Sequence, residues 1–127
     1  MPNGSYLQIK CMIVDDEPMA IEVVKRYIGL MPTLHLVGEF HNAIEATIFL
    51  QEQSVDIIFL DIRMPIMDGF EFMQEFEKLD ISKKNIKIYL LSSSLDPADV
   101  QRSSDNGYIT QLIHKPLTKQ ILEGISV

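Results

Sequence analysis

The sequence predicts an α/β fold in which helices cover both faces of a five-stranded parallel sheet. Two observations lead to this prediction. Short apolar runs alternate five times with longer segments in which apolar residues recur every three or four positions, a pattern typical of parallel strands joined by helices. The first and third runs are nearly continuous, as expected for strands buried on both sides. No linker or repeat interrupts the 127 residues, so we expect one domain over 1–127 with a core at about 9–125.

The elements follow from where the apolar pattern changes its period. Strands are expected over 8–14, 35–40, 55–60, 86–91 and 112–114. Helices are expected over about 18–31, 43–52, 69–79, 97–106 and 119–125. Right-handed crossovers make a doubly wound, three-layer (βα)5 sandwich the natural solution, with the flavodoxin-like strand order 2-1-3-4-5.

Residues that favour helix ends support the first two helices. Pro18 suits a first turn, because no backbone hydrogen bond is lost there. Pro32 is expected to end the same helix. Asn42 and Glu45 resemble a capping box at the start of the second helix.

The later helices have similar signals. Gly69 opens the third helix, Asp96 and Pro97 suit the cap and first position of the fourth, and Thr118 caps the last. In the fourth helix Val100 is almost the only large apolar residue, so we expect this helix to have low local stability.

Polar side chains follow four of the five expected strands. Asp15 and Asp16 follow the first, Asp61 the third, Ser92 the fourth and Lys115 the fifth. Each signal is weak alone, because paired acids usually form a solvated turn and a serine run is usually a polar loop. In a parallel sheet, however, all these strand ends open on the edge where ligands bind.

This constellation has a definite chemistry. Three close carboxylates repel one another, and a set of oxygen ligands suits Mg²⁺ better than zinc. The histidines, His35, His41 and His114, have no partner pattern that would make them ligands. A carboxylate can also attack phosphorus and form an aspartyl phosphate, while an amine and a hydroxyl hold the phosphoryl oxygens.

Three segments resemble the response-regulator receiver family. They are Ile-Val-Asp-Asp-Glu-Pro at 13–18, Phe-Leu-Asp-Ile-Arg-Met-Pro-Ile-Met-Asp-Gly at 59–69, and Lys115-Pro116. The likeness extends over about 9–125, and the middle segment is highly specific when it follows an apolar strand. The resemblance implies that Asp61 is the phosphoacceptor and that Asp15, Asp16, Asp61 and the backbone carbonyl of Arg63 bind Mg²⁺, with Asp16 the more direct ligand of the first pair.

The resemblance also implies roles for the last two loops. Lys115 would contact the phosphoryl group, and Ser92 would supply the switching hydroxyl, with Ser93 as the alternative. Many receivers have Tyr or Phe where this chain has Leu112, which puts the aromatic part of the usual switch in doubt. We expect a cis peptide bond between Lys115 and Pro116.

The partners follow from the same resemblance. A sensor histidine kinase or a phosphotransfer protein would supply the phosphoryl group. A downstream protein would bind the face formed by the fourth helix, the fifth strand and the last helix. The domain would catalyse only its own phosphorylation and dephosphorylation, and the resemblance leaves open whether the chain is complete or a fragment.

Composition limits the other possibilities. The net charge is -7 and Lys83-Lys84 is the nearest approach to a basic cluster, so we expect no direct contact with nucleic acid. Every apolar run is too short to span a membrane, and residues 1–6 lack the pattern of a signal peptide, so we expect a cytoplasmic protein. A single cysteine, Cys11, is expected to be a buried apolar residue.

The sequence argues against three rival functions. A phosphatase similar to haloacid dehalogenases would need a second Asp two residues after the first, where this chain has Arg63. A flavodoxin-type binding module would need a phosphate loop after the first strand, but residues 15–17 are acidic. A degenerate receiver that serves only as an interaction surface would not need the intact acidic set and Lys115.

Overall fold

The computed structural model describes residues 8–125 and confirms the alternation of strands and helices. The elements are β1 (Ile9–Val14), α1 (Pro18–Gly29), β2 (Leu34–Phe40), α2 (Ala43–Glu52), β3 (Ile57–Asp61), α3 (Gly69–Lys78), β4 (Lys87–Ser92), α4 (Pro97–Asp105), β5 (Ile109–His114) and α5 (Lys119–Ile125).

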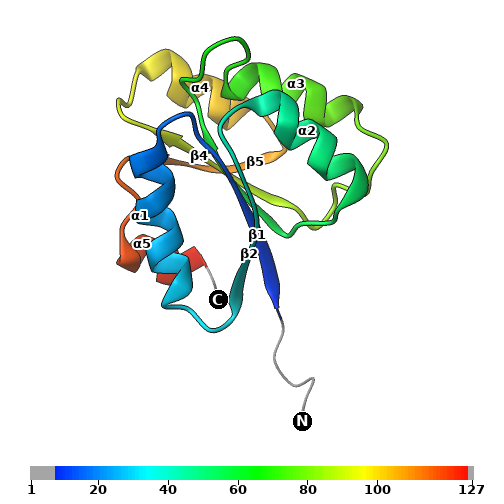
Figure 1. Cartoon of the computed structure of the whole chain (residues 1–127). Helices are drawn as coiled ribbons and strands as arrows, with labels where there is room; N and C mark the ends of the chain where they lie inside the picture. Colours follow the sequence, from blue (N-terminus) through cyan, green and yellow to red (C-terminus); the bar gives the residue numbers. More distant parts are fainter. Residues whose placement is uncertain (1–7, 126–127) are drawn as a thin grey trace.

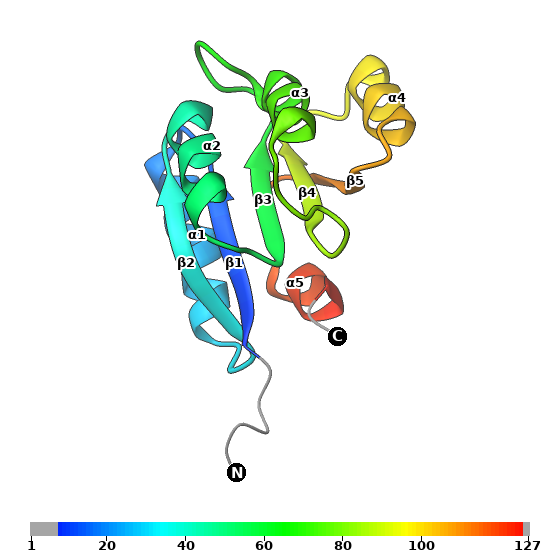
Figure 2. The same cartoon turned by 90° about the vertical axis from the view of Figure 1, so that its right-hand side faces the viewer.

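All strand pairs are parallel, and the strands lie in the order β2-β1-β3-β4-β5, as predicted. Helices α1 and α5 cover one face of the sheet, and α2, α3 and α4 lie on the other (Figures 1 and 2). Because every strand runs in the same direction, the carboxyl ends of β1, β3, β4 and β5 meet at one edge.

The central strands separate two apolar cores. Along β1, Met12 and Val14 face the core under α2 and α3, whereas Cys11 and Ile13 face the core under α1 and α5. This alternation explains why β1 is apolar at successive positions instead of every second one. Cys11 is fully buried, as predicted, and burial raises the pKa of its thiol to about 12.

Most element boundaries lie within one residue of the sequence expectation, but β3 starts at Ile57, two residues after the expected start at 55, and the end of α1 and the start of β5 also differ. Helix α1 ends at Gly29, and the amides of Leu30 and Met31 close its end by donating to Tyr27 and Ile28 at 3.1 and 3.0 Å. Met31 lies beyond the helix, because the residue before a proline avoids helical geometry. Its side chain is nevertheless buried. Strand β5 starts at Ile109, three residues before the expected start at 112.

The caps expected at Asn42, Asp96 and Thr118 are present, but among the described residues the Asn42–Glu45 capping box has only one of its two hydrogen bonds. Asn42 accepts a hydrogen bond from the amide of Glu45 at 2.9 Å, Asp96 accepts one from Ala98, and Thr118 accepts one from Ile121. The strongest cap was not predicted. It lies at α3, where Asp68 and Glu71 form a reciprocal capping box.

Helix α4 has few apolar anchors, as predicted. Within the described part of the chain its buried side chains are those of Asp99 and Ser103, and Val100 is exposed. The low local stability expected for this helix stays a prediction. Among residues 8–125, none of the helices has the length and apolar character that a membrane span requires.

Candidate functional site

The carboxyl edge of the sheet gathers the acidic side chains that the sequence singled out. Asp15 and Asp16 follow β1, and Asp61 is the last residue of β3. One carboxylate oxygen from each of these three residues lies within 4.8 Å of the other two. The topology therefore brings together residues that are 45 positions apart in the chain, as the sequence predicts.

Burial makes this cluster electrostatically costly. Only 1 % of Asp15 and 3 % of Asp61 are exposed to solvent. Burial, followed by the charge of Asp15, raises the pKa of the Asp61 carboxyl to about 7, and the opposing influence of Lys115 is too small to prevent this. A cation at this place would remove much of the mutual repulsion.

Lys115 supplies part of the missing positive charge. Its ammonium lies 2.9 Å from Asp15 Oδ2, 3.2 Å from Asp61 Oδ1 and 3.0 Å from Glu17 Oε1. Burial alone would lower the pKa of Lys115, but hydrogen bonds to Asp15 and Glu17 and the charges of Asp15 and Asp61 outweigh it, so the pKa is raised. Lys115 is therefore a firmly cationic partner of the acidic cluster.

The end of β5 positions Lys115. Its backbone amide donates to the carbonyl of Ser92 at 2.7 Å, which ties the end of β5 to β4. The peptide bond between Lys115 and Pro116 is cis, which confirms the prediction. The side chain thus reaches across the sheet edge towards β1 and β3.

The two neighbouring aspartates have different surroundings. Asp15 uses Oδ1 to accept the amide of Glu17 at 2.9 Å and Oδ2 to pair with Lys115. Asp16 Oδ1 is buried and has no hydrogen-bond partner among the described residues. A buried oxygen without a partner is unfavourable, and a metal ion would satisfy it. The oxygen-only donor set fits a hard cation such as Mg²⁺.

The two candidate serines are not equivalent. Only 1 % of Ser92 is exposed, and its hydroxyl donates to the carbonyl of Ser94 and accepts the amide of the same residue. Ser93 is exposed, and its carbonyl contacts the His114 ring. Ser92 follows Leu90 by two residues in β4, so it lies on the sheet face that Leu90 shares with Leu112.

The loop from β3 to α3 follows Asp61 directly in the chain. Gly69 donates its amide to Ile62 at 2.8 Å. Ile66 lies at the tip with a φ of 73°, which is strained for a β-branched residue, and it is 90 % exposed. Arg63 directs its side chain to Asp99 of α4, and no carboxylate occupies its position two residues after Asp61.

Two partnerships were missed by reasoning from the sequence. Glu17 pairs with Lys115, and Asp99 pairs with Arg63. The only available signal for Glu17 was its position directly after the acidic pair. Asp99 gave no signal, because an acidic residue in the first turn of a helix is common without any distant partner.

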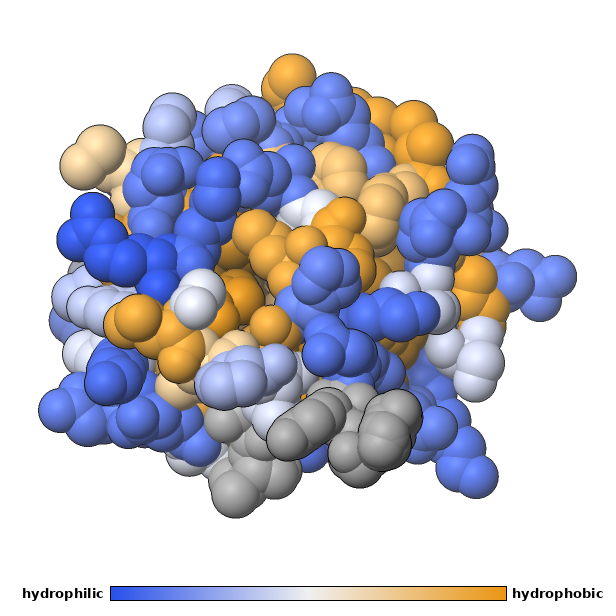
Figure 3. All heavy atoms as spheres, turned by 60° about the horizontal axis from the view of Figure 1, so that its bottom comes forward, coloured by the Kyte–Doolittle hydropathy of each residue, from blue (hydrophilic) through white to orange (hydrophobic). Residues whose placement is uncertain are grey.

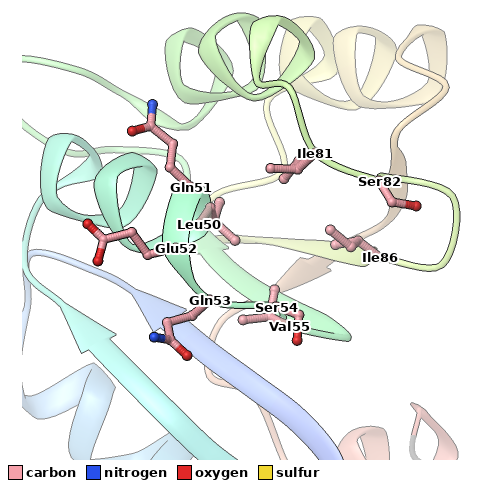
Figure 4. Close-up of a pocket in the computed structure, with 9 residues that line it drawn as sticks. All are labelled: Leu50, Gln51, Glu52, Gln53, Ser54, Val55, Ile81, Ser82 and Ile86. Atoms are coloured by element: carbon pink, nitrogen blue, oxygen red, sulfur yellow. The ribbon is translucent and has the colours of Figure 1, made fainter.

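A surface pocket lies at the other end of the sheet, away from the acidic cluster. This open pocket of about 250 Å³ is lined by the end of α2 and the loops that precede β3 and β4. Leu50, Ile81 and Ile86 point into it, whereas Glu52, its only ionisable lining residue, points away (Figure 4). Apolar side chains also gather in the middle of the lower face of the molecule, ringed by hydrophilic ones (Figure 3). Neither feature offers the chemistry of the acidic cluster.

Comparison with curated sequences points to one family. A model of the response regulator receiver domain matches residues 11–125. The response regulator protein VraR of Staphylococcus saprophyticus is 28% identical over 119 residues, and the match covers 94% of this chain and 56% of that protein. VraR of Staphylococcus aureus gives the same values. The chain therefore spans little more than half the length of these relatives.

Solved structures agree on the fold. A two component response regulator from Cytophaga hutchinsonii superimposes with a TM-score of 0.86 at 24% identity, covering 94% of both chains. A response regulator receiver protein from Dyadobacter fermentans gives 0.81 at 27% identity, covering 92% of this chain and 94% of the other. A chain of the CheX–CheY–BeF3–Mg complex from Borrelia burgdorferi gives 0.80 at 23% identity, covering 95% of this chain and 91% of the other. With a family match over nearly its whole length, the chain belongs to the response regulator receiver domain family of two-component systems.

Proposed function

We propose that this receiver domain accepts a phosphoryl group on Asp61 from a histidine kinase or a phosphotransfer protein, in a reaction that depends on Mg²⁺. One observation carries the proposal. Asp61 is buried at the carboxyl edge of the sheet, with Asp15 and Asp16 beside it and the ammonium of Lys115 3.2 Å from its Oδ1. No other group of residues within 8–125 combines a buried carboxylate with further acidic ligands and a cation.

The metal site would be formed by Asp16, Asp61, Asp15 and the backbone carbonyl of Arg63. The unpartnered oxygen of Asp16 and the proximity of the three carboxylates support this assignment. When bound, Mg²⁺ would neutralise charge on the carboxylates and on the phosphoryl oxygens. The Borrelia burgdorferi CheY complex, which contains BeF3 and Mg, is consistent with such a site in this fold.

In the proposed reaction a carboxylate oxygen of Asp61 attacks the phosphorus of a phosphohistidine. The new O–P bond forms as the P–N bond breaks, and the bonding electron pair returns to the imidazole nitrogen of the donor. Lys115 can hold a phosphoryl oxygen, because its ammonium already lies beside Asp61. The carboxylate must be ionised to attack, which is why a site that raises its pKa to about 7 benefits from added positive charge.

The proposed readout follows from β4 and β5. The hydroxyl of Ser92 would turn from Ser94 towards the phosphoryl group, and the loop that follows β4 would move with it. Leu112 has neither a ring nor a hydroxyl, so it cannot act as an aromatic switch. The altered surface would comprise α4, β5 and α5, would bind a protein and would not bind nucleic acid directly, in keeping with the net charge of -7.

A phosphatase-like hydrolase is a weaker proposal for this site. Such an enzyme needs a general acid close to the nucleophile. The residue two positions after Asp61 is Arg63, whose guanidinium is engaged by Asp99. A receiver that has lost phosphorylation is also a weaker proposal, because the acidic cluster and Lys115 are all in contact.

The test is mass spectrometry of the intact protein after incubation with acetyl phosphate and Mg²⁺. We expect one labile phosphoryl group on the natural protein and none on Asp61→Asn. Asp80→Asn is the matched control, because Asp80 is exposed in the loop between α3 and β4, and it should be labelled normally. Equal labelling of Asp61→Asn would reject Asp61 as the phosphoacceptor, and labelling that survives removal of Mg²⁺ by a chelator would reject the metal.

A further inference from the structure

Helix α4 is attached to the rest of the molecule through charged contacts. Its Asp99 side chain is only 6 % exposed and forms an ion pair with Arg63. A carboxylate this deeply buried is unfavourable unless it is paired. The apolar residues of this region do not replace the pair, because Leu95 and Val100 are exposed. The ion pair between Asp99 and Arg63 is therefore an important link between α4 and the rest of the molecule.

The two partners of this ion pair have very different exposure. The Arg63 side chain is 55 % exposed, against 6 % for Asp99. If the charge of Asp99 is lost, the guanidinium of Arg63 can be hydrated where it is. If Arg63 leaves, a buried anion remains without a partner, which is much more costly. The pair thus holds α4 only while Arg63 stays bound to it.

A second contact joins the same two parts of the molecule. The guanidinium of Arg102 in α4 lies 4.0 Å from the centre of the Phe70 ring, and Phe70 belongs to the first turn of α3. Helices α3 and α4 are neighbours at the carboxyl end of the sheet (Figures 1 and 2). Both arginine contacts therefore link α4 to the segment that begins at Asp61, one at each end of the β3–α3 loop.

Arg63 is also the cation placed closest in sequence to the proposed phosphoacceptor. It follows Asp61 by two residues and is the only basic residue in the segment 62–68. Phosphorylation of Asp61 would replace a carboxylate of charge −1 by a phosphoryl group that carries about −1.5 to −2 charge at neutral pH and offers strong hydrogen-bond acceptors. Arginine binds phosphoryl oxygens at least as well as it binds a carboxylate.

We infer that Arg63 and Asp99 form an electrostatic switch, in which the ion pair holds α4 in the unphosphorylated protein. A phosphoryl group on Asp61 competes for the Arg63 guanidinium, leaves Asp99 without its partner and loosens α4. This inference rests on the proposed function of Asp61. Arg63 and Asp99 act here as positioning residues for α4, and neither carries out the phosphoryl transfer through its side chain.

The test is hydrogen–deuterium exchange of the full chain, followed over residues 97–105, without and with beryllofluoride and Mg²⁺ as the phosphoryl mimic. In the natural protein, exchange in α4 should become faster by about tenfold or more with the mimic, since loss of a charged hydrogen-bonded pair has effects of that order. In Asp99→Asn the mimic should produce little further change, because no buried charge is left to release.

A second variant tests the pair without any phosphodonor. Arg63→Gln leaves the carboxylate of Asp99 buried and unpaired, so exchange in α4 should already be fast and close to that of the natural protein with the mimic. Asp105→Asn is the matched control, because Asp105 lies on the same helix but is exposed and bonded to Gln101. Its exchange, with and without the mimic, should match that of the natural protein.

The outcomes separate this inference from the proposed function. Absence of phosphoryl label on the natural protein counts against Asp61 as the acceptor. Normal labelling of Asp99→Asn, together with a full α4 response to the mimic, overturns the switch and leaves the acceptor intact. Unchanged α4 exchange in Arg63→Gln overturns the switch independently. This measurement remains decisive even where Asp99→Asn folds poorly.

Discussion

At Gly69 the start of α3 lies close against the end of β3. A Cβ atom at this position would lie 2.8 Å from the carbonyl oxygen of Asp61 and 3.0 Å from the Cα of Ile62. Both neighbours are backbone atoms of a buried strand end, so they cannot turn aside as a flexible side chain can. Any larger residue must shift α3 or the backbone of Asp61, which is the proposed phosphoacceptor.

Substitution of Gly69 by alanine should therefore lower the free energy of unfolding by about 1–3 kcal/mol, the usual range for overpacking a buried site. It should also slow labelling by acetyl phosphate, because the backbone that carries Asp61 moves. Urea unfolding measures the first effect, and Gly29→Ala is the control, since a Cβ at Gly29 meets nothing within 4 Å. A loss of stability no larger in Gly69→Ala than in Gly29→Ala would contradict this account.

For single residues, the sequence predicts where a side chain lies in the fold better than it predicts which other side chains it contacts. The convergence of Asp15, Asp16, Asp61 and Lys115 could be predicted, because the topology of a parallel sheet alone places strand ends together. The third partner of Lys115, which is Glu17, could not be predicted. Glu17 reaches it through a side-chain conformation in the loop after β1, and such a contact depends on the final packing and not on spacing along the chain.

Among the elements, α3 has the most completely capped start in the described chain. Asp68 accepts the amide of Glu71 at 2.8 Å, and Glu71 accepts the amide of Asp68 at 2.9 Å. The helix that follows places Phe72, Met73 and Phe76 in the core. The cap thus fixes where α3 begins, and with it the positions of Gly69 and Phe70 beside the site.

Removal of this cap should be measurable in the stability of the whole domain. Asp68→Ala should lower the free energy of unfolding by about 1 kcal/mol, and by up to about 2 kcal/mol if both bonds of the box are lost. Asp80→Ala, which changes an exposed acid beyond the helix, should have little effect. Chemical denaturation of the two variants provides the comparison, and equal stabilities would show that the box contributes nothing.

The elements that sequence reasoning placed least well lie at the edge of the sheet. Strand β5 was expected only at 112–114, but it begins at Ile109 and includes the polar residues Thr110 and Gln111. An edge strand has a neighbour on one side only, and the apolar pattern of β5 is short although its backbone pairs with β4 from Ile109 to His114, with one irregularity directly after Ile109. The central strands β1 and β3 had continuous apolar runs, since both of their faces are buried.

For the whole molecule, the main electrostatic problem is the concentration of negative charge at one edge. The net charge is -7, and three carboxylates share the site with the partly buried ammonium of Lys115. Ligand binding to the folded state alone stabilises it by mass action. A divalent cation that binds these carboxylates should therefore stabilise the domain as a whole, and the two adjacent aspartates should contribute differently.

Mg²⁺ at millimolar concentration should raise the melting temperature of the natural protein, because a free concentration about a hundredfold above Kd contributes about 2.7 kcal/mol. Asp16→Ala should abolish most of this gain and change the metal-free stability little, since Asp16 Oδ1 has no partner to lose. Asp15→Ala should instead lower the metal-free stability, because Asp15 binds both the Glu17 amide and Lys115.

Thermal melts of the three proteins, with and without Mg²⁺, decide between these roles. NaCl at matched ionic strength is the control for a general effect of charge screening, which should act on all three proteins alike. A gain in the natural protein that NaCl reproduces would argue against a specific site. An equal gain in Asp16→Ala and the natural protein would remove Asp16 from the ligand set, because the oxygen that lacks a protein partner would then have no role in holding the ion.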